Sequence, residues 1–456
     1  MDTISHGLFV PPVPTPPAAP LPVRAFLRAI RENALTIWPE AAYRDEVLVR
    51  RFFGRENVLL NAPEAIHHVL VDNYANYRRS PASIRILRPI TGDGLLLATG
   101  DAWRLQRRTV APALGPRVIP MLCRHIMVST RAALDTVSSD QPMDLLTFMQ
   151  TLALDIAGRS MFSLETRRHR EAMRRLLTEF GERFARPHLF DMLLPPAIPT
   201  IRDFARARFH KRWMRLIETI MRERTSAPAH DDAPRDLFDL LRDARDPETG
   251  AGFSPAELRD QVATLILAGH ETTAVTLFWA CVLLAGSPDT QDWMAEELSG
   301  VDLTEDGVQT RLTRTRAVVN ETLRLFPAAF TIVREAILPD QIGTLRLSRR
   351  SVVMIAPWVL HRHHAFWNDP GAFIPARFMP GAPPPPRFAF MPFGAGPRIC
   401  VGAQFAMAEA VLVLASFIQR FHVARADTRL VLPVAVVTTQ PDHAPLFRLT
   451  VRAGQV

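Results

Sequence analysis

The stretch Phe393–Gly402, F-G-A-G-P-R-I-C-V-G, is the most informative part of this 456-residue chain. Its cysteine, Cys400, stands at the end of a glycine-rich loop. Residues 404–421 follow with apolar side chains at helical spacing, so Cys400 lies at or just before a helix N-terminus, where unpaired N–H groups and the helix dipole favour a thiolate. Arg398 adds a positive charge two residues before the sulfur. Three glycines leave the backbone open to a flat ligand: Gly394, Gly396 and Gly402.

The complete spacing F-x-x-G-x-R-x-C-x-G resembles the haem-binding signature of the cytochrome P-450 superfamily of haem-thiolate monooxygenases. For a single cysteine, the alternative interpretation is a structural residue buried in a Gly/Pro loop. The resemblance implies that Cys400 is the axial ligand of the iron in a b-type haem. It also implies that the haem is surrounded by Phe393, Gly394, Arg398 and Gly402.

Residues 254–285 carry clear start and stop signals for one long helix. Ser254 and Glu257 form a capping box at its start, and Gly286 follows its end. A helix of this length extends roughly 45 Å. Most of it is apolar enough to cross a membrane, but a carboxylate such as Glu271 in the middle of a bilayer is costly. The pattern therefore favours a buried helix that crosses a whole domain.

A polar notch, A-G-H-E-T-T at residues 268–273, interrupts this apolar helix. The Thr272 hydroxyl can bond the carbonyl four residues earlier and distort the local hydrogen-bond ladder. The alternative is a mildly irregular core helix with a satisfied acid. A-G-x-E-T-T resembles the family's oxygen-activation motif, which implies that Thr272 stabilises dioxygen at the haem and that Glu271 relays protons from solvent. His270 occupies the variable position of this motif and receives no role.

Two further segments resemble the family's supporting ionic network. Glu321 and Arg324 are three residues apart in a predicted helix over 313–326, so they share one face. An ordinary surface ion pair is the alternative interpretation. The family has E-x-x-R at this place and P-x-R-F before the cysteine loop, and Arg377 stands in such a segment here. The resemblance implies that the three charges form a bonded network that fixes the cysteine loop.

Other residues resemble the family's contacts to the haem propionates. Trp103 and Arg107 are four residues apart on a predicted helix and share a face, so a surface aromatic–cation pair is the alternative. In the family W-x-x-x-R contacts a propionate, and Arg334 and Arg398 resemble two further contacts of this kind. His361 falls in a segment that resembles a solvent or propionate-side region, so we expect it near the haem.

Helical patterns dominate the chain, and short strand-like runs occur near 43–60, 332–356 and 430–450. Residues 79–100 read as a flexible apolar loop, residues 190–199 as a loop that resembles the family's substrate-entry lid, and residues 225–235 as a polar loop. The predicted fold is mainly α with small peripheral β-sheets, which the resemblance identifies with the triangular cytochrome P-450 prism. Predicted helices cover 24–38, 62–73, 101–113, 117–136, 144–162, 166–184, 200–224, 236–246, 255–285, 289–299, 313–326 and 403–421.

Composition limits the compartment and the domain organisation. Three cysteines (Cys123, Cys281 and Cys400) are too few for a disulfide framework, so we expect a reducing, cytoplasmic compartment. Residues 1–23 are proline-rich, and we expect them to be poorly ordered, with no pattern of an anchor or signal peptide. Residues 24–456 then form a single catalytic domain of the soluble bacterial type.

The net charge is +8 with one lysine, so nearly all of the positive charge is arginine. No basic stretch carries the interleaved aromatic residues of a nucleic-acid site. The simplest explanation of the arginine excess is a base-composition bias of the genome. A basic surface also suits an acidic electron-transfer partner.

The resemblance implies a monooxygenase that inserts one atom of dioxygen into a C–H bond or a double bond of a small hydrophobic substrate. Two electrons come from a separate ferredoxin or flavodoxin with its reductase, because no flavin or iron–sulfur module is evident. Three alternatives stay open: a peroxide-driven peroxygenase, a haem-thiolate rearrangement enzyme, and a non-catalytic haem-thiolate binder or gas sensor. Glu271 and Thr272 disfavour the first two, and the third lacks a partner or DNA-binding module.

The substrate pocket is assigned only by analogy with the positions where the family lines its own. All of these positions are apolar, so we expect a hydrophobic substrate, and fatty acids, terpenoids, steroids and aromatic compounds all stay open. The positions are Ile86, Leu87, Leu95, Leu96, Ala268, Phe330, Ile332 and Val437.

Overall fold

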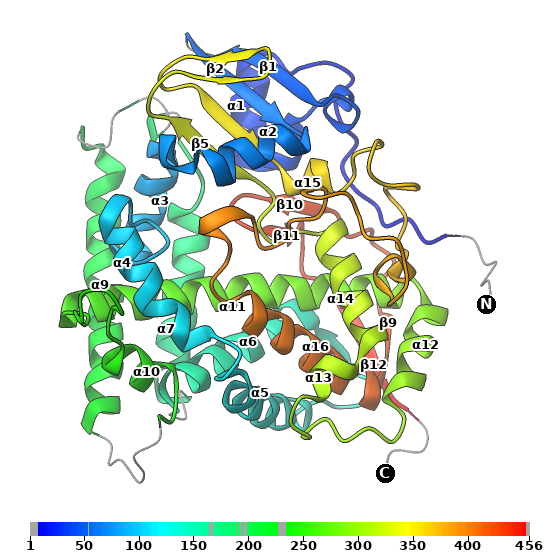
Figure 1. Cartoon of the computed structure of the whole chain (residues 1–456). Coiled ribbons are helices and arrows are strands. Elements are labelled where there is room, and N and C mark those ends of the chain that lie inside the picture. The colour runs from blue at the N-terminus through cyan, green and yellow to red at the C-terminus, as the bar shows by residue number, and fades with distance from the viewer. Residues whose placement is uncertain are drawn as a thin grey trace.

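The computed structural model describes residues 8–52, 54–163, 167–188, 190–191, 194, 198–226 and 234–452. Helices dominate these residues and small sheets lie at the periphery, which confirms the predicted fold class. One large cluster of buried apolar side chains extends along the chain from Phe26 to Leu449. Figure 1 shows the long helix α11 (Pro255–Ala285) crossing the middle of the molecule, with the largest sheet at one end.

Helix α11 is the element around which the others are arranged. The predicted capping box is present: Glu257 N donates to Ser254 Oγ at 3.3 Å, and Ser254 N donates to Glu257 Oε2 at 2.9 Å. Among the described residues, α11 is the one helix long and apolar enough to cross a membrane, and 72% of its most apolar window is buried. It packs against α3, α6, α9 and α16. The structure therefore favours a core helix over a membrane span.

The other long helices fall close to their predicted ranges. Boundaries differ by a few residues, and several predicted helices end in a short 3-10 or π turn. They are α1 (Val23–Glu32), α4 (Gly100–Val110), α5 (Ile119–Leu134), α6 (Leu145–Phe162), α7 (Arg167–Glu179), α9 (Ile201–Ser226), α10 (Leu237–Asp243), α12 (Pro288–Leu298), α14 (Thr313–Leu325) and α16 (Ala403–Arg420). The short helices are α2 (Pro63–His67), α13 (Val308–Arg311) and α15 (Pro357–Leu360).

The largest sheet has the strand order β1 (Val47–Phe52), β2 (Arg55–Leu60), β8 (Val352–Ile355), β5 (Ile332–Ala336) and β3 (Tyr77–Arg79). A three-stranded sheet joins β4 (Pro142–Asp144), β12 (Leu446–Val451) and β9 (Phe421–Arg425). Two hairpins pair β6 (Asp340–Ile342) with β7 (Leu345–Leu347) and β10 (Pro433–Ala435) with β11 (Thr439–Pro441). The sequence patterns missed β3, β4 and β9. The first two have only three residues and show no usable alternation, and β9 follows α16 directly, without a turn signal between them.

Residues 79–100 are not the flexible loop that the sequence predicted. Pro81–Thr91 forms helix α3, with Pro81 at its first turn and Ser80 Oγ accepting from Ser83 N at 3.2 Å. The glycines after it serve a close approach to α11. A Cβ on Gly94 would lie 2.2 Å from Thr264 Oγ1 and 2.6 Å from the Asp260 carbonyl oxygen.

Residues 8–22 correct the expectation of a poorly ordered N-terminal segment. The segment is extended, and its carbonyl oxygens bond to the rest of the protein, from Phe373 N to Phe9 O at 2.8 Å and from Glu40 N to Pro17 O at 3.0 Å. The ring of Phe9 fills the space beside Gly286, where a Cβ would lie 2.2 Å from Phe9 Cζ. An extended, proline-rich segment makes no internal hydrogen bonds, so its carbonyl groups can accept bonds from the rest of the protein. These bonds hold residues 8–22 in place.

The two other predicted loops lie partly outside the described residues. Residues 192–193 and 195–197 of the lid-like segment and residues 227–233 of the polar loop are not described. The described ends of the lid-like segment are held by Arg85 of α3, which donates to Phe190 O at 3.1 Å and to Ile198 O at 2.7 Å.

We predict that Gly94→Ala destabilises the protein by about 1–3 kcal/mol, because the added methyl overlaps backbone atoms of α11 that cannot move freely. The midpoint of thermal unfolding of the purified protein measures this loss. Gly181→Ala is the matched control, since a Cβ there meets nothing within 4 Å. Equal midpoints for the two variants would contradict the close approach.

Candidate active site

The loop that ends at Cys400 folds back on itself before α16 begins. Cys400 N donates to Phe393 O at 2.9 Å, which closes the loop. Gly394 and Gly396 have φ angles of 74° and 70°, a conformation that favours glycine. A Cβ on Gly396 would lie 2.0 Å from Leu70 O, so the segment after α2 packs directly on the loop. These contacts fix the backbone on which the sulfur is carried.

The surroundings of Cys400 differ from the predicted ones in one respect. Burial raises the pKa of the Cys400 thiol, although the Gly402 N–H and the Arg107 guanidinium both act to lower it. The residue nevertheless has exposed surface. Burial therefore outweighs the helix N-terminus, and the protein alone does not favour the thiolate. A coordinating metal ion deprotonates a thiol by itself.

Glu321 and Arg324 form a fully buried ion pair on α14. Arg324 Nε donates to Glu321 Oε2 at 2.7 Å, and Arg324 Nη2 donates to Glu321 Oε1 at 2.7 Å. Both side chains have no exposed surface. A two-pronged pair of this kind is strong and geometrically specific. The surface-pair alternative is therefore excluded for these two residues.

The pair continues into the segment that precedes the cysteine loop. Arg324 donates to the carbonyl oxygens of His361, Pro370 and Ala372 at 2.7–2.9 Å. Arg377 Nε lies 3.6 Å from Glu321 Oε1. The Arg324 guanidinium thus holds three carbonyl oxygens of the chain between residues 361 and 372 against α14. Arg377 approaches the same carboxylate, as expected.

Three arginines (Arg79, Arg334 and Arg398) converge with no carboxylate paired to them in the described part of the chain. Arg334 has a pKa lowered to about 9, mainly by burial and then by Arg79 and Arg398. Burial and Arg398 lower the pKa of Arg79 to about 10, and its Nε is buried without a hydrogen-bond partner within the described residues. Arg79 and Arg334 stand directly opposite each other on β3 and β5. Like charges in this position destabilise a sheet, so the cluster fits an anion that neutralises it.

The sequence reasoning missed Arg79. It named Arg334 and Arg398 from motifs, but Arg79 carries no motif. Its place follows only from the pairing of β3 with β5, which joins residues more than 250 positions apart in the chain. No local pattern in a three-residue strand could have shown this partner.

Trp103 and Arg107 share a face of α4, as the spacing predicts. The Arg398 guanidinium lies 4.4 Å from the centre of the Trp103 ring, which places Trp103 beside the arginine cluster. Arg107 Nη1 donates to Ile399 O at 2.8 Å, immediately before Cys400. Helix α4 therefore meets both the cluster and the cysteine loop.

His361 lies elsewhere than expected. Its ring is fully buried, its Nε2 accepts from Met391 N at 2.9 Å, and its carbonyl oxygen accepts from Arg324. Burial, with the charges of Arg324 and Arg362, lowers the pKa of His361 to about 3. We therefore correct the expected cofactor contact: His361 connects the ionic network to the start of the cysteine loop, because a neutral imidazole can accept from a backbone N–H.

The notch in α11 has the predicted local distortion. Thr272 Oγ1 donates to Ala268 O, four residues earlier, at 2.5 Å. Glu271 Oε1 accepts from Thr438 Oγ1 and Gln440 Nε2, both at 2.7 Å. His270 is buried and its Nε2 bonds to Gln150 O of α6 at 3.1 Å. No local sequence pattern indicates the two partners of Glu271, since they lie in a distant hairpin.

The residues expected to line the pocket come from four separate parts of the fold. Ile86 and Leu87 lie on α3, Leu95 and Leu96 follow it, Ala268 lies in the notch, Phe330 and Ile332 precede or begin β5, and Val437 lies between β10 and β11. Ala268 is exposed, whereas Phe330 is buried.

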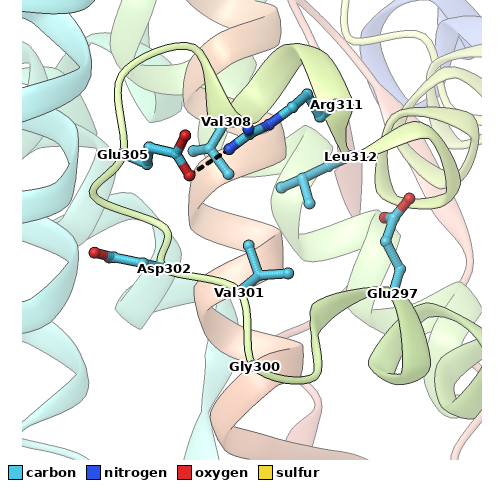
Figure 2. Close-up of a pocket in the computed structure, with 8 residues that line it drawn as sticks. All are labelled: Glu297, Gly300, Val301, Asp302, Glu305, Val308, Arg311 and Leu312. Atoms are coloured by element: carbon cyan, nitrogen blue, oxygen red, sulfur yellow. Dashed lines mark hydrogen bonds and ion pairs between the residues drawn. The ribbon is translucent and has the colours of Figure 1, made fainter.

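A separate hollow of about 340 Å³ lies between α12 and α13, lined by Glu297, Gly300, Val301, Asp302, Glu305, Val308, Arg311 and Leu312 (Figure 2). None of its lining residues belongs to the cysteine loop, the notch or the arginine cluster, so it is not part of this site.

The family model described as Cytochrome P450 matches residues 32–442, and the chain belongs to this family. It is accordingly an oxidoreductase that incorporates oxygen, with a haem-thiolate cofactor. Cyclooctatin synthase of Streptomyces melanosporofaciens is 33% identical over 79% of this chain and 79% of its own length. Cyclooctat-9-en-7-ol 5-monooxygenase of the same organism is 28% identical over 74% of this chain and 73% of its own length.

Solved structures show the same fold. The cytochrome P450DA heme domain has a TM-score of 0.75 at 23% identity and covers 89% of this chain and 90% of its own. A mutant of that domain has a TM-score of 0.77 over the same shares. The prism fold predicted from the cysteine motif is therefore confirmed.

The residues present fit a haem. The cofactor needs a sulfur ligand, a flat face and partners for two carboxylates, and the structure offers each. Cys400 is exposed, and positive-φ glycines leave its loop without side-chain bulk. The arginine cluster has no carboxylate in any ion pair of the described residues. The unpartnered Arg79 Nε is the most specific sign, because a buried cation without an anion is costly.

We predict that Glu321→Gln lowers the free energy of unfolding by about 3–5 kcal/mol, because the Arg324 charge stays buried without its partner. Urea unfolding of the purified protein measures it. Glu171→Gln is the matched control, since Glu171 and Arg174 form an i,i+3 pair that is exposed, and we expect little change. A similar loss of unfolding free energy in both variants would show that the buried pair contributes no more to stability than an exposed one.

We predict that Arg79→Gln weakens haem retention roughly tenfold or more, the effect of one lost hydrogen bond to a charged group. The rate of haem transfer from the holoprotein to excess apomyoglobin measures retention. Arg448→Gln, at an exposed position of β12, is the control and should transfer haem at the native rate. Native retention by Arg79→Gln would mean that the cluster binds something other than the haem carboxylates.

Proposed function

We propose that this protein is a monooxygenase that hydroxylates a C–H bond, or oxygenates a double bond, of a small hydrophobic substrate. For hydroxylation, the substrate, dioxygen, two electrons and two protons give the alcohol and one water. The observation that carries the proposal is the placement of the polar notch of α11 in the same fold as a closed cysteine loop with an exposed sulfur. This combination provides one place for a metal ligand and another for proton supply.

We infer a b-type haem, held without covalent attachment. The chain has three cysteines and no C-x-x-C-H segment, the pattern of covalent haem attachment. Cys400 would hold the iron, and Arg79, Arg334 and Arg398 would hold the carboxylates. When bound, the haem supplies the activation of dioxygen, which no side chain can provide.

The chain itself supplies orientation and protons. Thr272 presents a hydroxyl in the notch, where it donates to Ala268 O of its own helix, and it would turn from this bond to donate to a ligand in the notch. Glu271, the neighbouring acid, is half-buried and can pass protons inward from solvent. Acid and hydroxyl side by side suit stepwise proton delivery, in which the acid is the source and the hydroxyl the final donor.

The proposed substrate is apolar and cyclic or branched. The positions assigned to the pocket carry no charged side chain. One relative has a name that describes a monooxygenase acting at position 5 of cyclooctat-9-en-7-ol, which supports an alkenol-like substrate for this chain too.

The proposal is tested by titrating the ferric protein with one compound of each open class: lauric acid, geraniol, testosterone and naphthalene. A substrate that displaces the iron-bound water shifts the Soret band from its low-spin to its high-spin position. We expect a shift with geraniol above all, followed by dioxygen-dependent product. If no compound gave dioxygen-dependent product while hydrogen peroxide did, the peroxygenase alternative would hold instead.

We further propose a ferredoxin or flavodoxin, with its reductase, as the electron donor, and a cytoplasmic location. The net charge of +8 supports an acidic partner. Arg107 and the exposed Ile399 lie beside Cys400, where a partner would come nearest the iron. All three cysteines are free thiols, as a reducing compartment would keep them.

We predict that Thr272→Ala raises the yield of hydrogen peroxide relative to product several-fold, because the final proton donor is lost while dioxygen is still consumed. Peroxide, product and dioxygen measured in the same turnover experiment give this ratio. Thr272→Ser keeps the hydroxyl and should stay near the native ratio. Native coupling in the alanine variant would remove Thr272 from the proton path.

A further inference from the structure

The carboxylate of Glu271 is held by the segment that leads into β11. Thr438 Oγ1 and Gln440 Nε2 each donate to Glu271 Oε1 at 2.7 Å. Gln440 Nε2 also lies 3.1 Å from Thr438 Oγ1. Hydrogen bonds are directional, so two donors on one oxygen define the position of the carboxylate. Thr438 lies in the turn of the hairpin and Gln440 in β11, so the two donors reach the carboxylate from adjoining parts of one hairpin.

The hairpin that carries these donors is itself fixed. Trp279 Nε1 of α11 donates to Thr439 O at 2.8 Å, between the two donor residues. Asn33 holds the other strand, where its Nδ2 donates to Pro433 O at 2.9 Å and its Oδ1 accepts from Ala435 N at 3.0 Å. Figure 1 shows β10 and β11 above the middle of α11. The hairpin that carries the donors to Glu271 is therefore held in place on both of its strands.

Among the described residues, no other side chain of α11 bonds the Glu271 carboxylate. Thr272, the next residue of α11, directs its hydroxyl to Ala268 O and thus along its own helix. Val437 lies at the turn of the hairpin, half-buried against the core. Val437 directly precedes Thr438, so a ligand that contacts Val437 lies next to the residue whose hydroxyl holds Glu271.

We propose that Thr438 and Gln440 are positioning residues for proton supply. They hold the carboxylate of Glu271, the residue before Thr272, through two hydrogen bonds from the hairpin of β10 and β11. The inference rests on the proposed function, since it takes Glu271 as the proton relay. Loss of either donor leaves the substrate bound as before, while protons arrive less efficiently and more of the dioxygen leaves as peroxide.

The test compares Thr438→Val, which keeps the shape and removes the donor, with Thr438→Ser, which keeps the donor. The holoenzyme is used with the panel compound that gives the largest Soret shift. We expect Thr438→Val and Gln440→Met to raise the ratio of peroxide to product at least threefold. Thr438→Ser should stay within twofold of native, and the spectral dissociation constant of the compound should stay within twofold in all three.

A readout independent of turnover is the midpoint of thermal unfolding in a double-mutant cycle. The midpoint shift caused by Thr438→Val should fall by half or more when Glu271 is already replaced in Glu271→Met, because the donor then has no carboxylate to hold. Additive shifts would show that the bond does not exist in the holoenzyme.

Each outcome separates this inference from the proposed function. If Thr438→Val and Gln440→Met kept the native peroxide ratio while Glu271→Gln raised it, the acid would act without the hairpin and the inference would fall alone. If Glu271→Gln also behaved as native, the relay role would fall with it. If the native protein made no dioxygen-dependent product, the proposed function itself would be wrong. Should Thr438→Val lose its haem, the ratio of Gln440→Met decides.

Discussion

The buried ion pair between Glu321 and Arg324 is the contact on which the cysteine loop depends. It has no exposed surface, and Arg324 gathers three carbonyl oxygens of the chain between His361 and Ala372. That chain has little regular structure of its own, so its path is set by what it bonds to. Replacing such a pair with apolar residues is often neutral for the stability of a protein. We therefore infer that the contribution of this pair is to define the position of the loop.

The arginine cluster is a second constraint, and it runs against stability. Arg79 and Arg334 face each other across two strands. Burial lowers the pKa of both, and the charge of Arg398 lowers each of them further. A sheet built in this way is favourable only when an anion lies between the charges. The ionic network and the cluster thus have different roles. The network fixes the loop that carries Cys400, and the cluster favours the binding of a negatively charged ligand, which would neutralise its charges.

The sequence predicted what lies in local patterns and missed what depends on pairing in space. Three features could be predicted because each lies within ten residues of sequence. They are the capping box of α11, the notch at Thr272 and the motif around Cys400. Helix α3 was missed although Ser80 and Pro81 mark its start, because the glycines after it read as flexibility. Arg79 and the partners of Glu271 could not be predicted, since strand register and a hairpin more than 160 residues away place them.

The most direct test of the account is the absorption spectrum of the reduced, carbon-monoxide-bound protein, measured for the native chain and for Cys400→Ser after loading both with haem. The account predicts a Soret band at the red-shifted position of a thiolate ligand in the native protein. It predicts the loss of that band in Cys400→Ser, because the hydroxyl is a far weaker ligand. A normal thiolate band in the serine variant would show that another group holds the iron and would contradict the site described here.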